Sequence, residues 1–212
     1  MSRSALVVCF GDSLTAGFQS PTPENPMGAE TPYGRFLQDR LGEAALVRIS
    51  GVCGELTGEM VSRFRRSVSD RKPDYVPILG GTNDLGCGLS PDEIMANLTT
   101  LYELTLTAGG VPIPVTVPSI RVEGSQDNRE ANEWVAGHLD RRNALNKLIR
   151  GCAASRSLAL VDLFSATVDP ASGQLAAGYS NDGLHLTTAG YMRFAELVDQ
   201  VLRPMLQRVG RF

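Results

Sequence analysis

Strand-like and helix-like patterns of hydrophobic positions alternate along the chain. Residues 5–10 form an apolar run, Ala-Leu-Val-Val-Cys-Phe, and turn-forming Gly and Asp follow at once, which predicts a fully buried strand. Further strands are expected at residues 44–49, 74–79, 111–117 and 158–163. Between and after the strands, the pattern predicts helices over residues 33–41, 55–68, 91–106, 134–152 and 187–203.

Five strands that alternate with helices favour a parallel sheet with helices on both faces. We therefore expect one α/β domain over residues 1–212, since no internal repeat, low-complexity tract or linker interrupts the pattern. Proline conflicts with two of the strands, because it removes a hydrogen bond from the ladder. Pro77 falls inside the third strand, and Pro112 and Pro114 are expected at the start of the fourth. Pro204 is expected to disturb the end of the last helix.

The composition argues against several classes of protein. Of 212 residues, 42% are hydrophobic and 20% are charged, which fits a globular domain with a substantial core. The net charge of −3 argues against a nucleic-acid binder, which usually carries a basic face. No apolar run approaches the roughly 20 residues that a membrane span needs. The apolar run near the N-terminus is also shorter than that of a secretory signal.

The cysteines are scattered and form no Cys-x-x-Cys pair: Cys9, Cys53, Cys87 and Cys152. A chain of this length does not need disulfides to be stable, so we interpret them as free thiols and expect a cytoplasmic protein. With two histidines and no paired cysteines, a structural zinc site is not expected.

Ser13 lies just beyond the first predicted strand, on a sharp turn. In an open parallel sheet, ligands bind outside the carboxyl ends of the strands, so a nucleophile would be useful here. A serine attacks only when a base takes its proton and a third group orients the base. The alternative interpretation is a solvated turn serine.

His185 fits the role of base better than His138. His138 falls in the middle of a predicted helix and is interpreted as a packed or solvent-facing side chain. His185 lies in a polar loop three residues after Asp182, and Gly183 permits the tight turn that brings the carboxylate to the imidazole. We expect Ser13 to attack, His185 to transfer the proton and Asp182 to orient the imidazole. The alternative is an Asn-Asp-Gly surface turn with an incidental histidine.

The oxyanion that forms during acyl transfer needs preorganised hydrogen-bond donors. The predicted strand ends offer the backbone N–H of Ser13, the backbone N–H of Gly54 and the side-chain amide of Asn83. Gly54 has no Cβ, so a substrate can approach its backbone closely. The alternatives are a turn glycine and, for Asn83, a helix-capping residue beside Asp84.

Four blocks of the chain, in order and at suitable intervals, resemble the SGNH (GDSL-type) hydrolase family: residues 10–14, Gly54, residues 81–84 and residues 182–185. The resemblance implies a three-layer αβα sandwich around a flavodoxin-like, five-stranded parallel sheet. It also implies acyl-ester hydrolysis without a cofactor, with a catalytic triad and an oxyanion hole at the residues named above. The chain departs from the family at Ile49, where many members have asparagine; this affects the local hydrogen bonding and not the role of Gly54.

The expected partner is a small-molecule ester, and residues 80–86 resemble esterases that act on short acyl chains. Acyl-thioesters, lysophospholipids and acetylated sugars are alternatives within the family. The loops at residues 19–31, 85–89 and 119–131 are expected to shape the acyl and alcohol pockets, the last as a surface loop or a lid.

Other classes of protein explain fewer of these residues. An α/β-hydrolase is not favoured, because the Gly-x-Ser-x-Gly pattern fails at Thr15. A flavodoxin-like module that binds flavin mononucleotide at residues 13–17 would explain neither Asn83 nor the pair Asp182 and His185. A non-catalytic binding domain on the same fold would not need the four-part site.

Overall fold

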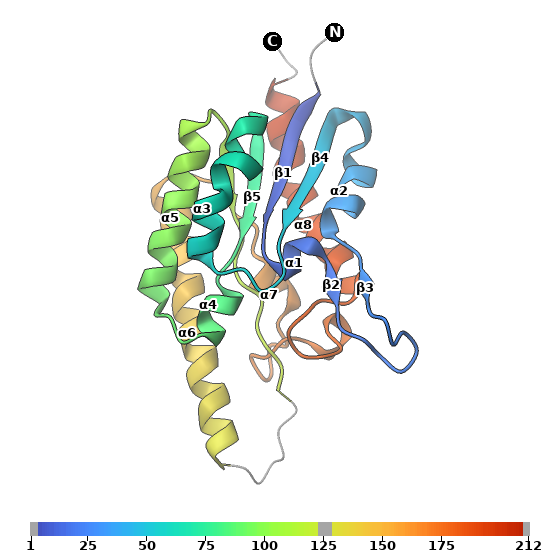
Figure 1. Cartoon of the computed structure of the whole chain (residues 1–212), viewed down its shortest axis with the longest axis vertical. Coiled ribbons are helices and arrows are strands. Elements are labelled where there is room, and N and C mark those ends of the chain that lie inside the picture. Colours follow the sequence, from blue (N-terminus) through green and yellow to red (C-terminus); the bar gives the residue numbers. More distant parts are fainter. Residues whose placement is uncertain (1–3, 123–128, 210–212) are drawn as a thin grey trace.

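Four parallel strands form the main sheet of the computed structural model, which describes residues 4–122 and 129–209 (Figure 1). They are β1 (Ala5–Gly11), β4 (Ala45–Gly51), β5 (Tyr75–Leu79) and β6 (Val111–Pro114), in the order β4-β1-β5-β6. Counted along the chain this order is 2-1-3-4, which is that of a doubly wound sheet. A small antiparallel pair, β2 (Phe18–Gln19) and β3 (Ala29–Glu30), lies apart from it.

Helices cover both faces of the sheet, as expected (Figure 1). On one face lie α3 (Thr57–Ser67), α5 (Pro91–Thr107) and α6 (Arg129–Ser155); on the other lie α2 (Tyr33–Leu41) and α8 (Thr188–Val209). Three short helices complete the fold: α1 (Ser13–Ala16), α4 (Thr82–Gly86) and α7 (Leu163–Thr167). Of these, α1 and α4 start directly beyond the carboxyl ends of β1 and β5. The α/β prediction is therefore confirmed.

The core lies on both sides of β1, whose central residues are fully buried. On one side the rings of Phe10 and Phe64 pack edge to face at 5.5 Å between centroids. On the other side Tyr33 of α2 stacks on Phe194 of α8 at 3.8 Å. Burial raises the pKa of the Cys9 thiol to about 12, which makes it an apolar part of this core.

The expected strand at residues 158–163 is reduced to a single bridge between Val115 and Val161. The Val115 N–H donates to the Ile78 carbonyl of β5, and the Val161 N–H donates to the Pro114 carbonyl. Backbone N–H and C=O groups of successive residues point alternately to the two neighbouring strands, so the backbone groups of Pro112 and Pro114 face away from β5, toward residues 158–163. Neither proline has an N–H to donate. The ladder with residues 158–163 therefore cannot extend in this direction.

One side chain from α2 covers the beginning of the outer edge of β4. The Gln38 Nε2 donates to the carbonyl oxygens of Gly42 and Ala45, at 2.9 and 3.0 Å. Its Oε1 accepts the Val47 N–H at 2.8 Å. Backbone groups that would otherwise be unpaired thus have partners within the same chain.

Several boundaries differ from expectation. α8 continues through Pro204 to Val209, so the expectation that this proline disturbs the helix end near residue 203 is wrong. The predicted strand at residues 74–79, in contrast, is present as β5, and Pro77 lies within it, opposite Ile113. Of the predicted loop at residues 119–131, residues 123–128 lie outside the described residues.

No helix in the described parts of the chain combines the length and apolarity needed to cross a membrane.

Candidate active site

Ser13 is the first residue of α1, at the carboxyl end of β1. The Asp12 carboxylate caps this short helix, because its Oδ1 accepts the Leu14 N–H at 2.9 Å. Gly11 is needed for the turn, since a Cβ there would lie 2.3 Å from the carbonyl oxygen of Leu79. The turn therefore holds Ser13, which is 5% exposed, at the edge of the sheet where ligands bind in such folds.

Asp182 and His185 form a hydrogen-bonded pair in the loop before α8. His185 Nδ1 lies 2.7 Å from Asp182 Oδ2. Asp182 Oδ1 accepts the backbone N–H groups of Leu184 and His185, each at 2.8 Å. Gly183 makes the turn with φ of +80°, which glycine adopts readily. The carboxylate thus faces Nδ1 and leaves Nε2 for a second partner.

Hydrogen bonds keep the Asp182 carboxylate ionised. Burial acts to raise its pKa, but hydrogen bonds from Ser20, His185 and backbone N–H groups outweigh burial and hold the pKa well below its usual range. The Ser20 hydroxyl donates to Oδ2, the same oxygen that faces the imidazole. An ionised carboxylate here favours a proton on Nδ1 and stabilises an imidazolium.

The strand that follows α1 packs against the His185 loop. The Phe18 ring of β2 lies edge-on to the imidazole, with 4.6 Å between ring centroids. The Phe18 carbonyl accepts a hydrogen bond from the Tyr191 hydroxyl of α8 at 2.6 Å. Between the described residues Ser13 and His185 there is no side-chain hydrogen bond. Catalytic hydrogen bonds often tighten only when substrate is bound.

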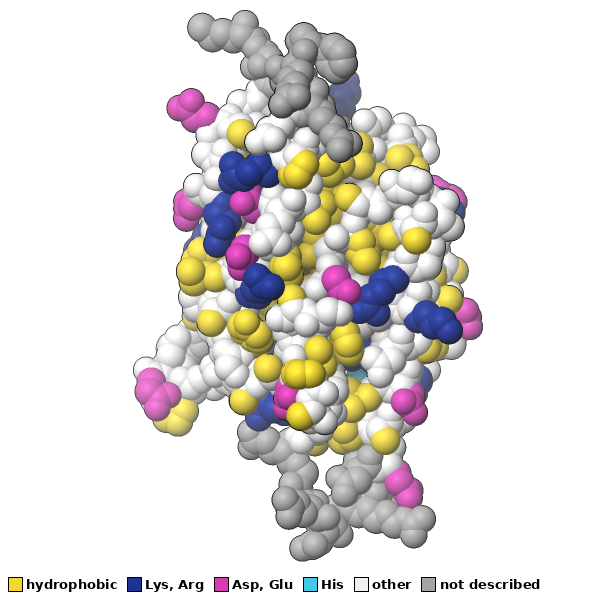
Figure 2. Space-filling view, turned by 180° about the vertical axis from the view of Figure 1, so that it is seen from behind, with side chains coloured by type: hydrophobic (Ala, Val, Ile, Leu, Met, Phe, Trp, Pro, Cys, Tyr) yellow, Lys and Arg dark blue, Asp and Glu magenta, His cyan; other side chains and the backbone are white. Residues whose placement is uncertain are grey.

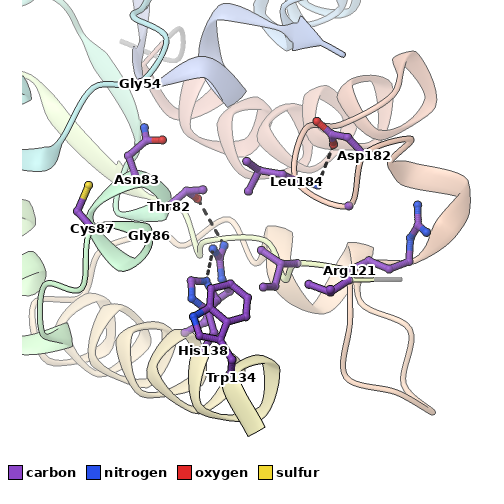
Figure 3. Close-up of a pocket in the computed structure, with 14 residues that line it drawn as sticks. Gly54, Thr82, Asn83, Gly86, Cys87, Arg121, Trp134, His138, Asp182 and Leu184 are labelled. Carbon is purple, nitrogen blue, oxygen red and sulfur yellow. Dashed lines mark hydrogen bonds between the residues drawn. The ribbon is translucent and has the colours of Figure 1, made fainter. Parts of the chain in front are cut away.

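Gly54 and Asn83 lie on one side of a cavity of about 420 Å³, and Asp182 lies across it (Figure 3). Gly54, between β4 and α3, has φ of +77° and open space where a Cβ would be. Asn83 is in α4, and its Nδ2 donates one hydrogen to the Glu55 carbonyl at 2.9 Å. The structure thus brings three of the five predicted residues to one cavity. Ser13 and His185 do not line it.

The α6 side of the cavity was missed by the sequence analysis. Trp134, His138 and Arg142 follow one another at four-residue spacing, so they share one face of α6, and all three line the cavity (Figure 3). Trp134 is 56% exposed, and its ring stacks on that of His138 with 5.2 Å between centroids. The spacing of four within a predicted helix was the signal that could have identified this face.

His138 and Arg142 form a buried pair. Arg142 Nη2 lies 3.2 Å from His138 Nε2, and because a guanidinium only donates, Nε2 accepts. Burial, together with Arg142 and Arg141, lowers the pKa of His138 to about 4. Burial also lowers the pKa of Arg142 to about 10. His138 is thus neutral, with Nε2 occupied, as suits a packed histidine.

The sequence matches the model of the GDSL-like lipase/acylhydrolase family over residues 9–193, which includes all five predicted site residues. An arylesterase of Vibrio mimicus is 30% identical over 120 residues, which is 54% of this chain and 56% of that protein. Esterase TesA of Pseudomonas aeruginosa is 25% identical over 210 residues, which is 97% of this chain and 90% of that protein.

Solved structures share the fold. Est24 of Sinorhizobium meliloti, described as a carbohydrate acetylesterase, superposes with a TM-score of 0.74 and covers 95% of this chain and 99% of its own. The two sequences are 20% identical. At this identity the likeness concerns the arrangement of strands and helices.

Proposed function

Because the chain belongs to the GDSL-like lipase/acylhydrolase family, we propose that it hydrolyses carboxylic esters through an acyl-enzyme on Ser13. The observation that carries this proposal is the Asp182–His185 pair, with 2.7 Å between Oδ2 and Nδ1. Its loop packs on Phe18, in the strand that directly follows the Ser13 helix. The hydroxyl, imidazole and carboxylate then divide the work as in other Ser-His-Asp sites.

His185 moves the proton in each half of the reaction. Its Nε2 takes the hydroxyl proton of Ser13 while Oγ attacks the ester carbonyl carbon. When the intermediate collapses, the bond to the alcohol oxygen breaks and the imidazolium gives the proton to that oxygen. The same imidazole then deprotonates a water, which attacks the carbonyl carbon of the acyl-Ser13. As this second intermediate collapses, the bond between that carbon and Oγ breaks, the imidazolium returns the proton to Oγ, and the acid leaves. Asp182 stays ionised and stabilises the imidazolium throughout.

Three donors would bind the oxyanion of both intermediates. The Ser13 N–H lies in the first turn of α1, where backbone N–H groups have no partner within the helix. Gly54 leaves its backbone open to approach. The Asn83 amide is already oriented by its bond to the Glu55 carbonyl, so little reorganisation accompanies the reaction.

Although Ser13 and His185 do not line the cavity, two of the proposed oxyanion donors, Gly54 and Asn83, do, and the cavity suits an ester with a short acyl chain or a single aromatic ring. Its volume of about 420 Å³ lies toward the lower end of small-molecule sites, which span about 300–1,000 Å³. Its apolar lining residues include Ile120, Val122, Trp134 and Leu184. Aromatic side chains pack well on aryl groups, in keeping with the arylesterase name of the Vibrio relative. An acetylated sugar is the second candidate, because the exposed Trp134 ring can also lie against a sugar.

Labelling with a p-nitrophenyl phosphonate tests the nucleophile. We expect one covalent adduct, located on Ser13 by mass spectrometry. We also expect a folded Ser13→Ala variant to lose the label and about 10³-fold or more in turnover. An adduct on another residue, or full activity in the variant, would end the proposal.

A panel of esters tests the substrate class. It includes p-nitrophenyl esters of rising chain length, phenyl acetate, an acyl-thioester, a lysophospholipid and an acetylated xylose. We expect the shortest p-nitrophenyl esters and phenyl acetate to have the highest kcat/KM. Faster hydrolysis of the xylose, thioester or lysophospholipid would identify that alternative. A flavin spectrum in the purified protein would instead support the flavin-binding alternative.

The cytoplasmic location expected from the sequence stays a prediction.

A further inference from the structure

A partly buried arginine connects the three strand ends that carry the proposed oxyanion donors. Arg63 lies in α3, and its side chain is 14% exposed. It forms a two-pronged ion pair with Glu55: Nε lies 2.5 Å from Oε1, and Nη2 lies 2.6 Å from Oε2. The guanidinium carbon lies 4.3 Å from the centre of the Phe10 ring.

The remaining donors of Arg63 reach two strands. Nη1 donates to the Ser50 hydroxyl at 2.8 Å, and Nη2 also donates to the Ser50 carbonyl at 3.2 Å. Nη2 further donates to the carbonyl of Gly11 at 3.1 Å. Gly11 ends β1 and lies two positions before Ser13, whereas Ser50 lies near the end of β4.

Glu55 extends this network to the other two donors. It directly follows Gly54 in the chain, so fixing the Glu55 side chain restricts the Gly54 turn. The Glu55 carbonyl accepts the Asn83 amide at 2.9 Å. Each proposed oxyanion donor is therefore close to a partner of Arg63. Ser13 lies two residues after Gly11, Gly54 directly precedes Glu55, and the Asn83 amide is hydrogen-bonded to the Glu55 carbonyl.

We propose that Arg63 is a positioning residue that fixes the mutual geometry of the Ser13, Gly54 and Asn83 donors; this inference depends on the proposed function. Donors stabilise an oxyanion strongly only when they are preorganised. A guanidinium suits this task because its donors project in a rigid planar fork, whereas a lysine ammonium is a compact charge on a flexible stem. The side chain of Ile49 cannot share this task, because it has no hydrogen-bonding group. Ile49 stands at the position where the resemblance leads one to expect asparagine.

The test compares Arg63→Lys and Arg63→Ala with the parent enzyme in steady-state hydrolysis of one short p-nitrophenyl ester. We expect kcat to fall at least tenfold in both variants, with KM within about threefold, because substrate binding does not require an aligned oxyanion hole. Methylguanidinium should restore part of the kcat of Arg63→Ala. Arg150→Lys is the matched control, because Arg150 pairs with Asp162, away from the cavity lining; its kcat should equal that of the parent.

Thermal unfolding followed by circular dichroism identifies variants that are not folded. If Arg63→Ala does not fold, Arg63→Lys and Glu55→Gln test the inference instead, since each puts in a side chain of similar length and removes part of the ion pair. A folded variant with kcat within twofold of the parent would overturn the inference, as would a loss that appears only in KM. Ser13→Ala, assayed in parallel, separates the two proposals: if it is active, the proposed function itself is wrong.

Discussion

The two oxygens of the Asp182 carboxylate have separate tasks. Oδ1 accepts the N–H groups that shape the loop, and Oδ2 faces the imidazole and the Ser20 hydroxyl. Loop shape and imidazole orientation thus depend on one charge. The short spacing of Asp182 and His185 made their pairing predictable from sequence, whereas Ser20 is 162 positions away and belongs to no recognisable pattern.

Substitution of the two histidines should give opposite results. We expect His185→Gln to lose most of its turnover, because the base is removed, and His138→Gln to keep most of it, because the His138 Nε2 is held by Arg142. Initial rates with a p-nitrophenyl ester, on variants with the parent circular dichroism spectrum, measure both effects. The reverse result would assign the role of base to His138.

Removal of the Asn83 amide should affect turnover and not substrate binding. Loss of one oxyanion donor costs about 10²–10³ in kcat, so we expect a fall of this order in Asn83→Ala with KM nearly unchanged. Asn143→Ala, at an exposed position of α6, is the control and should keep the parent kcat. An unchanged kcat in a folded Asn83→Ala would show that the amide is not a donor.

At the scale of elements, the ends of neighbouring strands converge on the site. Ser13 and Asn83 follow β1 and β5, and Gly54 lies in the loop after β4. The alternating sequence pattern predicts this convergence, because carboxyl ends of parallel strands share one edge of the sheet. The reduction of the fifth strand was not predictable from sequence. It depends on which neighbouring strand the backbone of Pro112 and Pro114 faces, and this is set by the pairing register, which the hydrophobic pattern does not specify.

The turn before His185 should tolerate no side chain at Gly183. Its φ is +80°, and a Cβ would lie 1.8 Å from the backbone carbonyl oxygen of Arg121. We expect Gly183→Ala to lower the unfolding free energy by about 1–3 kcal/mol and to reduce kcat, because the loop that carries His185 must move. Urea unfolding and initial rates measure the two effects.

Gly178→Ala is the matched control for that substitution. Gly178 lies in the same region of the chain, and an added Cβ there would meet open space beyond the neighbouring residues of its own turn. We expect stability and kcat close to those of the parent. Equal behaviour of the two alanine variants would contradict the assigned importance of the Gly183 turn.

Across the whole molecule, burial shifts ionisable groups in opposite directions. Burial raises the pKa of Asp12, beside Ser13, to about 7. Burial and neighbouring arginines lower the pKa of His138 to about 4. As acid is added, protonation of Asp12 favours the folded state, whereas protonation of His138 favours the unfolded one. Sequence could not predict these shifts, because they arise from segments that come together only in the fold.

His138→Gln should make the protein less sensitive to acid. The pKa of His138 is about 4 when folded and near its ordinary 6.5 when unfolded, so its titration leaves the stability unchanged above pH 6.5 and lowers it as the pH falls toward 4, where the unfolded state binds the proton more readily. Between pH 7.5 and pH 4.5, the unfolding free energy of the parent should fall by about 2 kcal/mol more than that of the variant. Urea unfolding at pH 7.5 and 4.5 measures it; equal losses would contradict the expectation.

The face of the molecule shown in Figure 2 carries charges of both signs around yellow apolar areas. How copies of the chain meet in concentrated solution also depends on the edges of the sheet. An open strand edge can recruit a strand from another molecule and so seed aggregates. At the outer rim of β4 the Gln38 amide already occupies the groups of Ala45 and Val47. These two groups are therefore not available to a strand of another copy, so a single uncharged side chain protects this part of the edge against pairing between molecules.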